Sequence, residues 1–201
     1  MPTKTKAKPQ PKRSSLPAWL TLDRAMIGGT VLFVVVIVVV LAANSSRASY
    51  VDNLKIDGVE PYAVLSSTHI DGTVNYPQTP PVGGAHSPVW QNCGVYTEPL
   101  YNENAVHSLE HGAVWITYQP GLAADQLQKL QDITRQSSHR LLSPYPGIDS
   151  PIILSAWGYQ LKLDNADDPR LMEFIQKYEQ GPTTPELGAA CSGGTSITAA
   201  S

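Results

Sequence analysis

The chain has 201 residues, of which 15% are charged, and its formal net charge is −3. The charge is unevenly distributed, because six of the 14 Lys and Arg residues but only one of the 17 Asp and Glu residues precede residue 25, which leaves about −8 on the remainder. This acidic remainder argues against a nucleic-acid-binding protein, since such proteins need clustered basic side chains.

An uncharged apolar run, AMIGGTVLFVVVIVVVLAA, occupies residues 25–43. As a helix it would be about 28 Å long, close to the hydrocarbon thickness of a bilayer. The sequence therefore predicts a transmembrane helix over residues 25–43. A cleaved signal peptide is the alternative, but its apolar core is usually about 7–15 residues long, and the following LAANSSRAS offers only weak cleavage sites.

The basic flank of this helix predicts its orientation. Residues 1–24 form a basic tail, opposed only by Asp23, with the side chains Lys4, Lys6, Lys8, Lys12, Arg13 and Arg24. Lys and Arg next to a span stay on the cytoplasmic side, and Trp19 is placed to anchor the helix at that interface. We therefore expect a single-pass protein whose lipid partner is the cell membrane, with the N-terminus cytoplasmic and the C-terminal domain extracytoplasmic.

The remainder is long enough for one domain with its own core. We expect a juxtamembrane spacer over residues 44–60, an extracytoplasmic domain over 61–194 and a disordered tail over 195–201. Within the domain, residues 61–104 are rich in Pro, Gly, Tyr and Asn, which excludes a long helix or a central strand. The aromatic side chains there favour a long ordered loop, and such loops are often functional.

The second half of the domain has regular periodicity. It predicts strands at 113–118, 140–142 and 152–157, and QLKL could extend the last of these. It also predicts a helix at 123–135 and a second helix that begins after Asp168-Pro169. The apolar face of this second helix consists of Leu171, Phe174, Ile175 and Tyr178. This order predicts an α+β fold, with helices packed on a mixed β-sheet. It is similar to the second half of a thioredoxin-like fold, although the chain has no C-x-x-C motif.

Both cysteines, Cys93 and Cys191, follow the predicted span. An even number of cysteines in an oxidising compartment favours a disulfide between them. The alternative is that Cys93 is a thiolate ligand or a redox thiol.

The histidines carry the strongest chemical signal. His107 and His111 in HSLEHG are spaced i, i+4, so that a short helix would place both imidazoles on one face and allow them to bind one metal ion. His86, and His69 as a further candidate, could complete a copper or zinc site, with Glu110 as a ligand or as the acceptor that orients one.

Two other interpretations of the histidines stay open. They could form a hydrogen-bonded network that holds the Pro-rich segment, in a non-enzymatic envelope module. The pattern H-x-x-E-H is also that of one class of zinc proteases, but the small domain and the short helix make a metallohydrolase a third choice. His139 lies outside the cluster, and the helical spacing of Met172 places it at the edge of the core.

The segments NYPQTPPVGGAHSPVWQNCGVY and HSLEHGAVWITYQPGL resemble the bacterial family catalogued as domain of unknown function 3105. SPYPGIDSPIILSAWG and GPTTPELGAACSGG are similar to later parts of that family, so the resemblance covers roughly residues 60–194. It implies a bacterial origin and attachment to a membrane. It assigns no activity and no role to the histidines or the cysteines.

Overall fold

The computed structural model describes residues 22–64 and 66–199. The predicted basic tail therefore lies largely outside the described residues, as does Trp19. The chain divides into two compact units, one up to Ser49 and one from Tyr50 onward.

The first unit consists of most of the helix α1 (Leu22–Asn53). Within α1, the segment Ile27–Ser46 has a mean hydropathy of 2.6 and is exposed along its length. It is long and apolar enough to cross a membrane, and a signal sequence near the N-terminus would have the same properties. The predicted span of residues 25–43 lies within α1.

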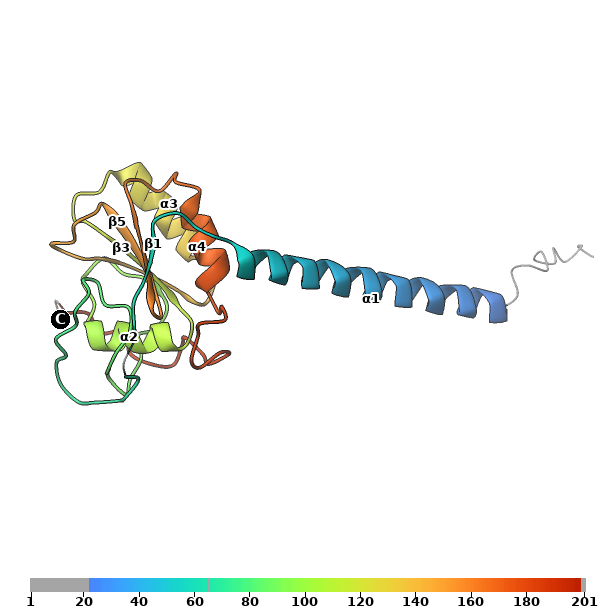
Figure 1. Cartoon of the computed structure of the whole chain (residues 1–201), viewed down its shortest axis with the longest axis horizontal. Coiled ribbons are helices and arrows are strands. Elements are labelled where there is room, and N and C mark those ends of the chain that lie inside the picture. The colour runs from blue at the N-terminus through green and yellow to red at the C-terminus, as the bar shows by residue number, and fades with distance from the viewer. Residues whose placement is uncertain (1–21, 65, 200–201) are drawn as a thin grey trace, which may run out of the picture. The chain divides into compact units, whose positions relative to one another are not determined.

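The second unit is built on a six-stranded sheet in the order β1-β6-β5-β3-β4-β2 (Figure 1). Strand β4 is parallel to β2 and β3, and the other neighbouring pairs are antiparallel. The sheet is therefore mixed, and the predicted α+β class is confirmed. The strands are β1 (Val59–Pro61), β2 (Gly94–Val95), β3 (Val114–Tyr118), β4 (Arg140–Pro144), β5 (Ile152–Ala156) and β6 (Tyr159–Leu163).

Helices cover both faces of this sheet. Helices α3 (Ala124–Thr134) and α4 (Arg170–Tyr178) pack on one face, and α2 (Asn102–Glu110) packs on the other (Figure 1). The alternation of side chains along β3 produces the two cores, because Val114 and Ile116 face α3 and α4 whereas Trp115 faces α2. Burying an apolar side chain of this size contributes roughly 1.5–3 kcal/mol.

Three expectations from the sequence differ from the structure. QLKL does not extend β5, because a turn at Gly158, whose φ is +76°, reverses the chain and makes β6 a separate antiparallel strand. Residues 44–60 are not a simple spacer, because α1 continues to Asn53 and β1 begins at Val59, on an edge that β6 offers for pairing. The tail is ordered at Thr195, whose backbone bonds to Trp90 and Asn92.

Helix α2 ends abruptly, and this end positions the candidate site. The Gly112 N–H donates to the Leu109 carbonyl at 2.9 Å, and the Ala113 N–H donates to the Ser108 carbonyl at 3.0 Å. This pair of hydrogen bonds forms a Schellman motif, which places Gly112 in the left-handed region at φ +86°. Glu110 and His111 therefore lie in the last turn and the C-cap of α2.

Candidate metal centre

The long Pro-rich loop lies against α2 and brings two histidines to it. The Ile70 N–H donates to the His86 carbonyl at 2.7 Å, and the His86 N–H donates to the Thr68 carbonyl at 3.1 Å, so that His69 and His86 form an isolated β-bridge. Farther along, the Gln91 N–H donates to the Asn104 carbonyl on α2 at 3.0 Å. The loop is ordered, as the sequence predicts, and it presents both imidazoles to the C-terminal end of α2.

Four side chains meet there and form the first group. One ligand atom from each of His69, His86, His107 and Glu110 lies within 4.8 Å of the other three. The three ring centroids are 4.7–4.8 Å apart, and the ring of His69 stacks on that of His107 with an interplanar angle of 20°. Three members are buried, and His69 is exposed. The group could hold a single ion close to the surface.

Backbone carbonyls define the tautomers of the two buried histidines. His86 Nδ1 is 2.8 Å from the Gly84 carbonyl, and His107 Nδ1 is 2.7 Å from the Ser87 carbonyl. A carbonyl oxygen only accepts hydrogen bonds, so we assign the proton of each neutral ring to Nδ1. Each Nε2 then keeps its lone pair, which is the arrangement that metal-binding histidines adopt.

Glu110 completes the group with a buried carboxylate. Its Oε2 is 2.9 Å from His86 Nε2 and 3.6 Å from His69 Nε2. Neither Oε2 nor His86 Nε2 has a hydrogen-bond partner within the described part of the chain. With the proton of His86 on Nδ1, two acceptor atoms face each other, and a positive charge, a proton or a metal ion, is needed to relieve their repulsion.

The electrostatics of the site keep His107 neutral. Burial lowers the pKa of His107 from 6.5 to about 4, and the neighbouring His111, His86 and His69 lower it further, although the hydrogen bond to Ser87 opposes them. A neutral imidazole at physiological pH is available as a ligand. The C-terminal end of the α2 dipole also favours a cation at this position.

His111 joins a second group, on the other side of His107. A ligand atom from each of His107, His111 and Glu186 lies within 4.8 Å of the other two. The rings of His107 and His111 are 4.6 Å apart, so the i, i+4 pair is adjacent as the sequence suggests. His86, however, is grouped with His69 and Glu110 and not with His111, so the predicted ligands divide into two groups that share His107.

The remaining predicted residues lie where the sequence places them. Cys93 and Cys191 form a disulfide with a Cα–Cα distance of 5.3 Å, which excludes Cys93 as a free thiolate. His139 lies outside both groups, with its Nε2 3.0 Å from the Ala189 carbonyl. Met172, within α4, is partly buried against the core.

Glu186 is the site residue that the sequence reasoning missed. Its segment is held at the end of α2, because the Glu186 N–H donates to the Glu110 carbonyl at 3.1 Å. The predicted disulfide is the feature from which the position of Glu186 could have been inferred. Glu186 lies five positions before Cys191, whose partner Cys93 follows the loop that contacts α2.

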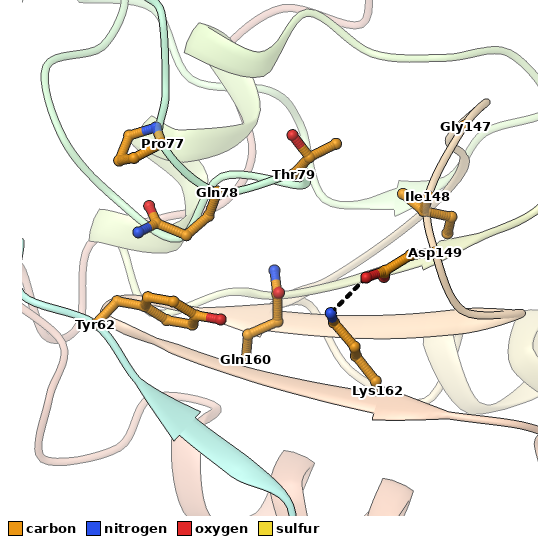
Figure 2. Close-up of a pocket in the computed structure, with 9 residues that line it drawn as sticks. All are labelled: Tyr62, Pro77, Gln78, Thr79, Gly147, Ile148, Asp149, Gln160 and Lys162. Atoms are coloured by element: carbon orange, nitrogen blue, oxygen red, sulfur yellow. Dashed lines mark hydrogen bonds and ion pairs between the residues drawn. The ribbon is translucent and has the colours of Figure 1, made fainter.

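A polar pocket elsewhere in the domain is a weaker candidate. It has a volume of about 420 Å³ and lies between the loop around Gln78 and strand β6 (Figure 2). Its two charged side chains, Asp149 and Lys162, form an ion pair at 2.7 Å. The Gln160 amide donates to the Pro80 carbonyl and to Ser155. These satisfied groups leave little unpaired chemistry for a ligand, in contrast to the histidine groups.

The family of this chain can now be stated. Residues 68–193 match the family described as Protein of unknown function (DUF3105), and the chain belongs to that family. The match contains both histidine groups and the disulfide. No curated protein and no solved structure matches the chain.

Proposed function

We propose that the domain binds one transition metal ion, copper or zinc, through His69, His86, His107 and Glu110. The observation that carries this proposal is that two buried histidines, His86 and His107, bond to backbone carbonyls through Nδ1, while His86 Nε2 lies 2.9 Å from a buried carboxylate oxygen of Glu110. Three imidazoles and a carboxylate are a donor set that suits zinc or copper(II). The distances from Glu110 Oε2 to His86 Nε2 and to His69 Nε2, 2.9 and 3.6 Å, are close to the roughly 3–4 Å that separates ligands bound at about 2.0–2.1 Å, and the four donors, which lie within 4.8 Å of one another, would close up around an ion.

We also propose that α1 anchors the domain at the outer face of a bacterial cell membrane. The apolar length of Ile27–Ser46 and the disulfide Cys93–Cys191 support this location, since disulfides persist in oxidising compartments. In that setting the domain would meet metal ions outside the cytoplasm.

A structural role is the second candidate, and one observation favours it. The bond between His107 Nδ1 and the Ser87 carbonyl holds the Pro-rich loop to α2, and the bond between His86 Nδ1 and the Gly84 carbonyl fixes the loop's own conformation, so both histidines contribute to the fold with or without an ion. A metallohydrolase has less support. Glu110 faces His69 and His86, whereas His111 faces Glu186. The side chains of the H-x-x-E-H motif therefore do not converge on one common metal site.

The replacement Glu110→Gln separates the two candidates. Removing a metal-binding carboxylate should weaken binding of copper(II) or zinc by about tenfold or more. The metal-free protein should lose little stability, because the change removes a buried charge that lacks a partner. The measurements are metal content and affinity of the purified full chain in detergent, and its thermal unfolding after chelation. Glu98→Gln, at an exposed position near Tyr118, is the control with the same change of charge.

If wild-type protein binds neither metal, the metal proposal is wrong. Unchanged affinity combined with strong destabilisation of the chelated Glu110→Gln variant would support the structural role instead.

A further inference from the structure

The second group repeats the geometry of the first. His111 Nδ1 is 2.8 Å from the Ala190 carbonyl, which assigns the proton of the neutral ring to Nδ1. Its Nε2 is 3.3 Å from the carboxylate of Glu186. The pattern of a carbonyl-oriented imidazole facing a carboxylate therefore occurs twice, once on each side of His107. The two carboxylates differ in accessibility, because the side chain of Glu110 is 5% exposed and that of Glu186 is 51% exposed.

We propose that His107, His111 and Glu186 form a capture position for the metal ion, from which it moves into the buried group. This inference rests on the proposed metal-binding function. His107 belongs to both groups, and it provides a ligand that can stay with the ion or exchange it between neighbouring positions.

His107 also limits the number of ions. Its Nδ1 is bonded to the Ser87 carbonyl, so one nitrogen, Nε2, remains for coordination. A single lone pair binds one ion at a time, so the two positions cannot both use His107 at once. The chain should therefore hold one ion at saturation, not two.

The direction of movement follows from exposure and from the number of donors. The exposed Glu186 carboxylate attracts a cation from solution and raises its local concentration. The capture position offers three donors, whereas the buried group offers four, three of them shielded from water. A site with fewer ligands, more exposed to water, binds an ion more weakly. Transfer of the ion from the capture position to the group that contains Glu110 therefore lowers the free energy of the bound ion.

A built-in reporter makes the step measurable. The ring of Trp90 lies 5.0 Å from that of His111 and 5.6 Å from that of His107. Copper(II) quenches tryptophan fluorescence at such distances, so stopped-flow mixing of copper(II) with the full chain in detergent follows uptake. The equilibrium dissociation constant is measured separately, by competition with a chelator.

We expect Glu186→Gln to slow copper(II) uptake by about tenfold or more, the effect typical of losing electrostatic attraction at a charged site. The release rate should fall by the same factor, so the dissociation constant stays within about twofold, because a capture position changes the path and not the end state. The stoichiometry should stay at one ion per chain. Glu98→Gln should match the wild type in all three measurements.

Three results would overturn the capture position while leaving the proposed function intact. They are an unchanged uptake rate in Glu186→Gln, a dissociation constant in that variant weakened well beyond twofold, and two ions per wild-type chain. Absence of copper(II) and zinc binding by the wild type would instead overturn the proposed function.

Discussion

At the scale of single residues, the protonation of His107 links the site to pH. Its pKa is lowered to about 4 in the folded protein, mainly by burial, whereas an unfolded chain has a histidine pKa near 6.5. Between these values the unfolded chain binds a proton that folded His107 does not. The free energy of unfolding of the metal-free protein should therefore decrease as the pH falls from about 6.5 to about 4, and this contribution should level off below that range.

The variant His107→Gln tests the direction of this pH dependence of stability. It removes the titrating group, so its unfolding free energy should change less steeply with pH over the same range. Thermal unfolding of chelated protein, measured at steps of pH, provides the comparison. Identical slopes for His107→Gln and wild type would show that folding does not lower the pKa of His107.

At the scale of secondary-structure elements, the end of α2 depends on Gly112. Its φ of +86° is unfavourable for any residue with a Cβ, and a Cβ there would lie 2.9 Å from the side chain of Thr184 and closer still to Gln180. We expect Gly112→Ala to destabilise the protein by about 1–3 kcal/mol. It should also weaken metal binding, because the proposed ligand Glu110 lies in the last turn of α2, directly before the C-cap and Gly112. Chemical denaturation and metal titration measure the two effects.

Gly121 offers a matched control for this change. It has a similar φ of +94°, but a Cβ at this position would have no neighbouring atom within 4 Å, so Gly121→Ala introduces backbone strain without a clash. We expect Gly112→Ala to be clearly more destabilising and Gly121→Ala to leave metal binding unchanged. Equal losses of stability would mean that the contact with Thr184 and Gln180 relaxes at little cost.

The sequence predicts elements that have strong periodicity of their own. The β-branched and aromatic residues of β3, followed by Pro-Gly, and the apolar face of α4 identify these elements within a residue or two. Strands β1 and β2 are two or three residues long and exist because a neighbouring strand edge is available, so no local pattern marks them. The turn at Gly158 was missed because the alternating polar and apolar residues of QLKL are typical of a strand and follow closely after β5.

The candidate site, like the fold, is predictable from the sequence only where its residues are close together along the chain. The i, i+4 spacing of His107 and His111 is a local signal and identifies the adjacent pair. The approach of His86 and His69 depends on a β-bridge within an irregular loop, and that of Glu186 depends on a segment about 80 residues farther along the chain. Long-range contacts of this kind leave no periodic trace, so the sequence could not separate one group of ligands from two.

At the scale of the whole molecule, the prediction concerns topology. The basic tail before residue 25 and the apolar segment Ile27–Ser46 predict a cytoplasmic N-terminus and an extracytoplasmic domain. A reporter that is active only in the cytoplasm should be inactive when fused after Ser201, and one that needs an oxidising compartment should be active there. Both cysteines should resist thiol labelling in protein denatured without reductant, because an oxidising compartment preserves their disulfide.

A separate experiment distinguishes an anchor from a cleaved signal sequence. An anchor keeps the N-terminal residues on the mature protein, which stays in the membrane fraction after a high-salt wash, whereas cleavage near Ala43 releases a shortened chain. N-terminal sequencing of the mature protein gives the answer.

Replacing the basic residues of the tail with Gln should produce a mixed orientation, because the Lys and Arg bias that fixes the orientation is lost. Cytoplasmic reporter activity in the wild type would reverse the topology and place the histidine groups in a reducing compartment.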